Sequence, residues 1–202
     1  MRWSRQEYIS LMTFGGSERQ MFVELFGPLV GLPEEWRAQG ATQQEIDMVA
    51  FDWDYVPRID CGGHTGPFGT PDEIILQDTA EYQLIRDHLG RTSKLPKGRA
   101  TIPLPQDFPV HDMDSWLRIK PYFQYCDERI DWQQVEKARQ AQQQGVMVTA
   151  DIPGGFDVPR ELMGEVTACL AYYEQPELMD DIVQTLTETS LRVLDQVSEH
   201  VT

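Results

Sequence analysis

Residues 146–164 read VMVTADIPGGFDVPRELMG, an apolar run that leads into a pair of glycines and then into a charged cluster around Pro159. The run VMVTA predicts a buried strand, and Pro159 favours the start of a helix, because proline fits the first helical turn. The glycines between them are typical either of a mobile surface loop or of a strand that ends at a binding site. We interpret the stretch as a strand that ends on a ligand-facing rim.

Outward from this stretch, the sequence predicts alternating strands and helices. Expected parallel strands have continuous apolar runs, and they are residues 21–26, 48–56 and 146–152. Expected helices have capping residues or helical periodicity, and they are residues 32–36, 42–49, 131–144, 159–170 and 176–201. A glycine-rich loop at 58–73 and an antiparallel meander at 74–95 lie between the second and third expected parallel strands. This order predicts an α/β fold in one domain, residues 1–202, with a meander insert at about 72–98.

In α/β folds of this kind, ligands bind at the carboxyl ends of the parallel strands. If the three expected strands are neighbours, residues at or just after their ends share one rim. The candidate substrate-binding residues are Glu24, Asp52, Asp54, Gly154, Gly155, Phe156 and Arg160. As alternatives, Asp52 and Asp54 are a carboxylate pair on one side of an extended segment or simply solvated side chains. Arg160 either binds a substrate anion or forms an ion pair with Asp157 or Glu161.

The composition excludes several classes of partner. The 202 residues include 33 acidic and 17 basic side chains, a formal net charge of −16, which repels nucleic acids and anionic membranes. The first residues lack the apolar centre of a signal peptide, and no apolar run is long enough to span a bilayer. A cytoplasmic location is therefore expected. The three cysteines are far apart in sequence, which indicates reduced thiols rather than a disulfide framework.

Several segments, taken in order, resemble proteins of the uroporphyrinogen decarboxylase superfamily, which includes the cobamide-dependent methyltransferases. They are FGGSERQMFVELF, VAFDWDYVP, EIILQDTAEYQLIRDHLGRTSKLPKG, PLPQDFPVHDMDSW, DIPGGFDVPRELMG and YYEQPELMDDIVQTLTETSLRVLDQV. The resemblance implies a partial (β/α)8 TIM-type barrel with about three parallel barrel strands and the inserted meander. The LGRTSK turn is more similar to the methyltransferase-related branch than to the haem-pathway enzyme.

Two departures limit what the resemblance implies. The decarboxylases carry two arginines before a Leu-Pro-Glu sequence, and here Phe26 and Val30 occupy those positions before Leu32. A polycarboxylate substrate would therefore lack its partners. Asp52, five residues before Pro57, matches the family aspartate. A family tyrosine corresponds to Glu165 here, so that position does not match. Porphyrinogen decarboxylation is accordingly disfavoured.

The second departure is length, because family members continue through a second half that holds the zinc-binding histidine and cysteines of the methyltransferases. This chain alone is expected to bind no metal, since Cys61 and His64 are too few ligands for zinc. Zinc and a corrinoid are expected only in a completed barrel. The expected partners are a complementary C-terminal barrel half or a second copy, together with a corrinoid protein.

The sequence leaves three functions open. The first is a subunit or fragment of a superfamily enzyme linked to corrinoid-dependent methyl transfer. The second is a non-catalytic half-barrel that binds a partner, and the third, disfavoured, is a porphyrinogen decarboxylase fragment. The loop GGHTGPFG is interpreted as a solvent loop rather than a nucleotide site, because no Gly-Lys-Ser/Thr follows it.

Overall fold

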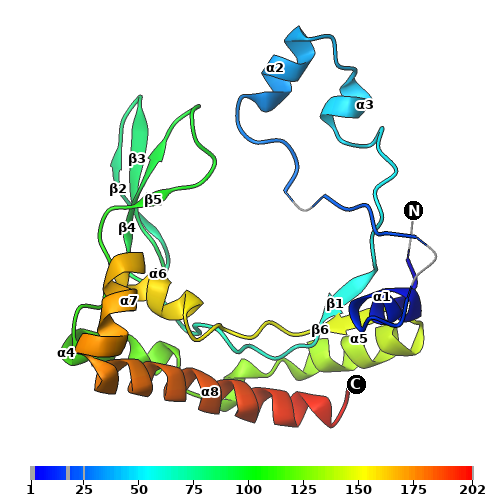
Figure 1. Cartoon of the computed structure of the whole chain (residues 1–202). Coiled ribbons are helices and arrows are strands. Elements are labelled where there is room, and N and C mark those ends of the chain that lie inside the picture. Colours follow the sequence, from blue (N-terminus) through cyan, green and yellow to red (C-terminus); the bar gives the residue numbers. More distant parts are fainter. Residues whose placement is uncertain (1–2, 17–18, 25, 202) are drawn as a thin grey trace.

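The computed structural model describes residues 3–16, 19–24 and 26–201 (Figure 1). Its α-helices are α1 (Arg5–Met12), α2 (Leu32–Ala38), α3 (Gln43–Ile46), α4 (Met113–Ile119), α5 (Trp132–Gln143), α6 (Asp157–Met163), α7 (Glu165–Glu174) and α8 (Pro176–Ser198), with short 3₁₀ turns η1 (Lys120–Tyr122) and η2 (Asp127–Arg129). Its strands are β1 (Arg58–Asp60), β2 (Ile74–Asp78), β3 (Tyr82–Arg86), β4 (Thr92–Pro96), β5 (Leu104–Pro105) and β6 (Met147–Thr149). The fold is therefore mixed α/β, as predicted.

The strands form two separate sheets. β1 and β6 pair in parallel, with Arg58 opposite Met147 and Asp60 opposite Thr149. β2, β3, β4 and β5 form an antiparallel sheet in sequence order. Within the described residues the strands do not close into a barrel, so the structure contains one parallel pair where about three barrel strands were expected.

The prediction of strands at 21–26 and 48–56 was wrong for the described residues; residue 25 lies outside them. The parallel partner of β6 is instead β1, in the segment expected to be a loop. The two apolar runs still lie beside each other, because the Asp54 amide donates to the Phe22 carbonyl at 2.6 Å. A continuous ladder does not form, since the buried Asp54 carboxylate accepts from the Phe22 amide and binds the Arg19 guanidinium.

The meander prediction is confirmed, and β5 extends it into the proline-rich segment. β3 pairs with β4 over five residues without a register shift. Lys97 and Asp78 form an ion pair across the sheet. β5 (Leu104–Pro105) lies at the edge, where Pro105 is tolerated because an edge strand needs fewer backbone donors.

The helix predictions are largely confirmed, because their start signals are local. The Asp131 side chain caps α5 by accepting from the amides of Gln133 and Gln134, both at 3.0 Å. The helix expected at 159–170 is divided into α6 and α7 at Gly164, whose φ of +80° disfavours other residues. A Cβ atom at Gly164 would also lie 2.8 Å from the Phe108 ring.

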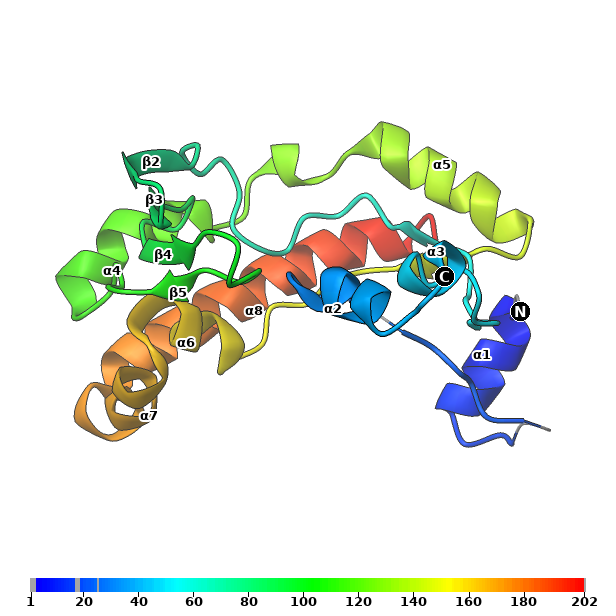
Figure 2. The ribbon, with the colours of Figure 1, turned by 90° about the horizontal axis from the view of Figure 1, so that it is seen from above.

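Helix α8 connects two hydrophobic clusters. Its first half packs with α4, α6 and α7 through Leu178, Ile182 and Leu186. Its last half contributes Val193 and Val197 to a second cluster with α5 and the β1–β6 pair. Seen from above in Figure 2, the meander and α4, α6 and α7 lie toward one end of α8. The β1–β6 pair lies toward the other end, as Figure 1 shows.

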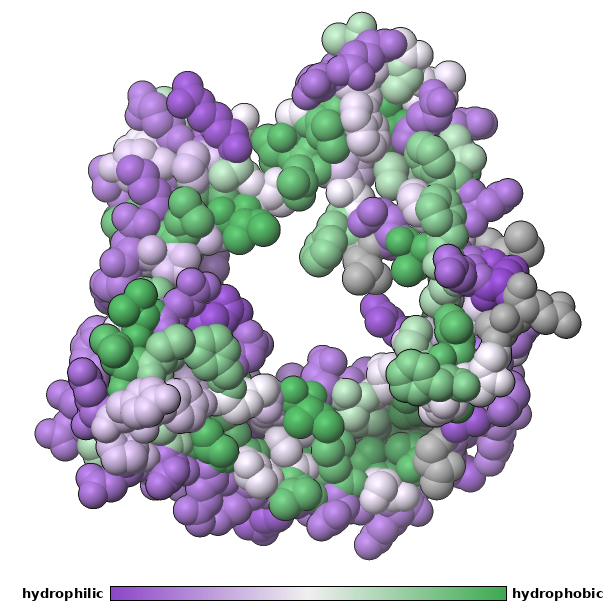
Figure 3. All heavy atoms as spheres, viewed as in Figure 1, coloured by the Kyte–Doolittle hydropathy of each residue, from purple (hydrophilic) through white to green (hydrophobic). Residues whose placement is uncertain are grey.

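The arm formed by residues 19–24 and 26–57, which contains α2 and α3, extends away from α8 and faces the meander across an opening (Figure 1). Hydrophobic surface lies along parts of the border of this opening in Figure 3. Exposed apolar side chains occur on the arm, the meander and the segment after β6; they include Phe22, Phe26, Leu29, Val30, Ile75, Ile102, Leu104, Ile152 and Phe156. In the part of the chain that is described, no helix has both the length and the hydrophobicity required of a transmembrane span.

Candidate functional site

A pocket of about 250 Å³ lies at the carboxyl ends of the two parallel strands. β1 ends at Asp60, which Cys61, Gly62 and Gly63 follow, and β6 is followed by Asp151 and then by Gly154 and Gly155. Each strand thus has an aspartate at or shortly after its end, and a glycine pair follows that aspartate. The pocket is lined by Asp60, Gly63, His64, Thr65, Gly66, Pro67 and Asp151.

The loop after β1 is partly buried, so the interpretation of GGHTGPFG as a solvent loop is wrong for Gly62, Gly63 and Thr65, whereas His64 is exposed. Cys61, Gly62, Gly63 and Thr65 are all buried. A Cβ atom at Gly62 would lie 2.7 Å from the Val135 amide of α5, and one at Gly63 would lie 2.7 Å from a Val193 methyl of α8. These glycines are therefore required by close packing against two helices.

Arg129 binds backbone carbonyls of the same loop. Its side chain is 1% exposed, and its guanidinium donates to the carbonyls of His64 at 3.0 Å and Gly66 at 2.6 Å. It also donates to the carbonyls of Gln124 at 2.9 Å and Tyr122 at 2.6 Å. Burial lowers the pKa of the Arg129 guanidinium. One buried cation therefore joins the pocket loop to the segment between α4 and α5.

Two of the residues that line the pocket are acidic, Asp60 and Asp151. The Asp60 carboxylate accepts from the Gly62 amide at 2.8 Å, and the Thr65 hydroxyl donates to the Asp151 carbonyl. No lysine or arginine belongs to the residues that line this pocket. Burial raises the pKa of the neighbouring Cys61 thiol, and the charges of Asp60 and Asp151 act in the same direction. The pocket thus favours a cationic or hydroxyl-bearing group.

The two faces of the β1–β6 pair differ. Ile59 and Val148 pack against the hydrophobic cluster that α5 and α8 share. Side chains alternate along a strand, so Arg58 and Asp60 lie on the opposite face, where both are exposed. A polar, open face beside the pocket is the arrangement expected of a ligand-facing sheet surface.

Three of the predicted site residues lie on the arm. Glu24 is exposed, and its carboxylate accepts from the Phe26 amide at 2.9 Å. Asp52 is exposed, whereas Asp54 is 1% exposed and bonded to Arg19. The Arg19 hydrogen bonds hold the pKa of Asp54 well below its ordinary value. Since their surroundings differ, Asp52 and Asp54 do not behave as a matched pair.

The other predicted residues lie where the segment after β6 reaches α6, away from the arm in Figure 1. Phe156 is 46% exposed, and the Gly155 carbonyl accepts from the Tyr172 hydroxyl at 2.7 Å. Arg160 donates to Asp157 at 2.7 Å, the ion-pair alternative, and this hydrogen bond raises the Arg160 pKa. Of these predicted residues, Gly154 and Gly155 are nearest in sequence to Asp151, which lines the pocket.

Sequence reasoning missed Asp60, Asp151 and Arg129, and it considered His64 only as an insufficient zinc ligand. The repeated order of a short strand, an aspartate and a glycine pair could have identified the two aspartates. Arg129 gave no such signal, because its role depends on carbonyls more than 60 residues away in sequence, those of His64 and Gly66.

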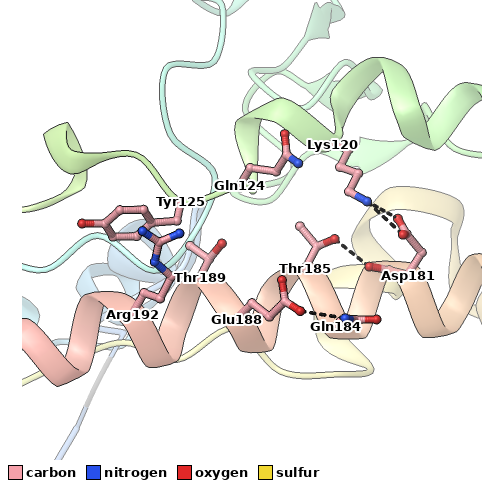
Figure 4. A pocket seen from close by; sticks show the side chains of 9 residues that line it. All are labelled: Lys120, Gln124, Tyr125, Asp181, Gln184, Thr185, Glu188, Thr189 and Arg192. Carbon is pink, nitrogen blue, oxygen red and sulfur yellow. Dashed lines mark hydrogen bonds and ion pairs between the residues drawn. The ribbon is translucent and has the colours of Figure 1, made fainter.

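A second, polar pocket of about 380 Å³ lies along the middle of α8 (Figure 4). Lys120 binds the Asp181 carboxylate at 2.8 Å, Gln184 donates to Glu188 at 2.7 Å, and Arg192 lies 3.8 Å from the Tyr125 ring centre. These side chains satisfy one another, so the pocket functions as a polar contact between α8 and the chain after α4.

Metal binding was also tested against the structure. Across residues 3–16, 19–24 and 26–201, no group of three or more His, Cys, Asp or Glu side chains is placed to hold a metal ion. The Cys61 sulfur receives the Gly63 amide at 3.3 Å and is buried. Cys61 and His64 therefore do not fit a zinc site by themselves.

Comparisons with protein-family models, curated proteins and solved structures found no match to this chain. The resemblance to the uroporphyrinogen decarboxylase superfamily accordingly stays a prediction from sequence segments.

Proposed function

We propose that this chain is one part of an enzyme similar to the uroporphyrinogen decarboxylase and methyltransferase superfamily, and that it binds a small molecule at the carboxyl ends of β1 and β6. The observation that carries this proposal is the pocket that Asp60 and the loop after β1 form with Asp151, which follows β6. In parallel α/β sheets this edge is the usual ligand site. Asp60 and Asp151 would orient a cationic or hydroxyl-bearing part of the substrate.

The proposed reaction is linked to corrinoid-dependent methyl transfer and requires a complementary barrel half. That half would supply the zinc ligands, since the described residues lack a set that fits zinc. Zinc, when bound there, would lower the pKa of a substrate thiol. The residues of this chain would hold the substrate beside it and exclude water from one side.

The second candidate is a non-catalytic half-barrel that binds a partner protein. The exposed apolar residues of the arm and meander favour it, because large exposed apolar patches mark interaction sites. A porphyrinogen decarboxylase fragment is a weaker candidate, since Phe26 and Val30 replace the expected arginines and are 87% and 49% exposed.

The test is reconstitution. The chain is co-expressed with a polypeptide that carries the second half of such a barrel, including one His and two Cys, and methyl transfer from methylcobalamin to a thiol is measured. We expect a stable complex that contains zinc and is active. Asp60→Asn keeps an oxygen for the Gly62 amide but removes charge, so it should lower kcat/KM at least about tenfold. The exposed Asp72→Asn is the matched control.

Two outcomes separate the candidates. A complex without activity or zinc would support the binding protein. A monodisperse monomer that binds no second half would contradict both the split enzyme and its requirement for a partner.

A further inference from the structure

A further cavity lies between the meander and the corner where α6 meets α7. These elements lie next to each other in Figure 1, and the cavity has a volume of about 450 Å³. Pro105 and Phe108 line it from one side, and Met163 and Val166 line it from the other. Sites for small molecules commonly have volumes of about 300–1,000 Å³ and apolar walls. The size and the apolar lining of this cavity therefore suit a small molecule.

The apolar lining runs from the protein interior to the surface. A Cβ atom at Gly164 would lie 2.8 Å from the Phe108 ring, so the ring lies directly against the backbone between the two helices. Met163 is buried beside it, whereas Val166 is 74% exposed. An apolar group can thus enter from solvent and contact an aromatic ring that is already held in place.

The two arginines of this cavity are already occupied by carboxylates. The Arg91 Nε donates to Asp87 at 2.6 Å, and its Nη1 lies 3.1 Å from the Glu161 carboxylate. The Arg160 Nη2 donates to Asp157 at 2.7 Å. An anionic ligand would have to displace one of these partners, so the cavity disfavours an anionic group.

The carboxylates, by contrast, are in surplus. Four of them, those of Asp87, Asp157, Glu161 and Glu165, surround the two guanidinium groups, which leaves a formal charge of −2. The Glu165 carboxylate is 3.7 Å from Arg160, and the Glu161 Oε1 is 3.8 Å from it. Both distances are too long for hydrogen bonds, so these oxygens can accept from a ligand.

An ammonium group fits these acceptors, because it carries three donors and one positive charge. The formal charge of −16 on the whole chain also favours the approach of a cation. A quaternary ammonium would lack the donors, and a guanidinium would repeat the group that Arg160 already supplies. The combination of apolar lining and free carboxylate oxygens is therefore typical of a site for a primary amine.

We propose that this cavity binds a small primary amine with an apolar body, whose ammonium lies between Glu161 and Glu165 and whose body contacts Phe108 and Met163. The inference does not rest on the proposed function, because this cavity shares no lining residue with the pocket at β1 and β6. A ligand bound here would contact both the segment after β5 and the α6–α7 corner, and so join the meander to the helices.

The probe is 2-phenylethylamine, titrated into the full chain and followed by NMR. A ligand of this size should bind with a Kd on the order of 1 mM, and the amide signals of Phe108, Val166 and Thr167 should shift. The matched anion 3-phenylpropionate has a similar shape and the opposite charge. It should bind at least about tenfold more weakly, because it meets surplus carboxylates.

Variants on one helix test the same contacts. Glu165→Gln should weaken amine binding at least about threefold, whereas Glu174→Gln, an exposed position at the other end of α7, should bind as the parent does. Val166→Lys places a competing ammonium beside Glu165 and should weaken binding at least about tenfold; Leu170→Lys, at a 49% exposed position, is its control.

Three outcomes would overturn the inference. They are equal binding of the amine and the anion, an unchanged Glu165→Gln variant, and signal shifts at Thr65 and Gly66 that Asp60→Asn removes. The last outcome would place the amine in the pocket at β1 and β6. Retained binding in Asp60→Asn, with shifts at Phe108 and Val166, would support a separate site.

Discussion

Replacing Arg129 with methionine tests whether a buried cation maintains the pocket. The variant removes four hydrogen bonds to main-chain carbonyls, with lengths between 2.6 and 3.0 Å. At about 1 kcal/mol each, their loss would cost about 4 kcal/mol. Relief of the guanidinium desolvation offsets part of this loss, so we expect a net decrease of about 2–3 kcal/mol in the free energy of unfolding.

The assay is urea unfolding followed by tryptophan fluorescence, together with hydrogen exchange over residues 62–68. With a slope of about 2 kcal/mol per molar urea, Arg129→Met should lower the midpoint by about 1 M. Arg129→Lys keeps the charge but replaces three donor nitrogens with one, so it should not restore stability. Arg139→Met removes an exposed ion pair with Glu136 and should leave the urea midpoint close to that of the parent.

A midpoint for Arg129→Met within about 0.2 M of the parent would refute the reasoning, since that shift is near the uncertainty of the method. Full recovery with Arg129→Lys would also refute it. In that case charge alone, and not the fork of donors, would support the loop.

Three further predictions follow from local geometry. Gly164→Ala should lower the unfolding free energy by more than about 1 kcal/mol in the same urea assay, because φ is +80° there. Gly155→Ala should be near neutral, because a Cβ atom added at Gly155 would have no non-neighbouring atom within 4 Å. The pKa of Asp54 is lower folded than unfolded, so its contribution is full above about pH 5 and is lost as pH falls below the ordinary value of 3.8; Asp54→Asn should flatten the stability–pH curve in that acid range. In mass-spectrometric alkylation at pH 8, exposed Cys169 should react before Cys61, whose thiol pKa burial raises; faster reaction at Cys61 would contradict this.

The helices were predictable because their signals lie within a few residues. Thr42 and Glu45 form a reciprocal capping box at the start of α3, and Asp131 caps α5, as the sequence indicated. The division at Gly164 was missed because it depends on the distant Phe108 ring.

The parallel strands were less predictable, since pairing joins residues almost 90 positions apart. The apolar run at 48–56 contacts the run at 21–26 through side chains: Trp53 stacks on Phe22 at 4.4 Å, and the Asp54 carboxylate takes the Phe22 amide that a strand ladder would use. β1 has only three residues, with one of them turned to the core, so it lacks the continuous apolar pattern that identified β6.

The position of Arg129 bears on what the pocket can bind. His64 and Gly66 line the pocket, and their backbone carbonyls accept hydrogen bonds from the Arg129 guanidinium. Two hydrogen bonds from this buried guanidinium hold the loop in place beside the carboxylates of Asp60 and Asp151. A pocket with two carboxylates beside a fixed loop matches a cationic or hydroxyl-bearing group better than an anionic one.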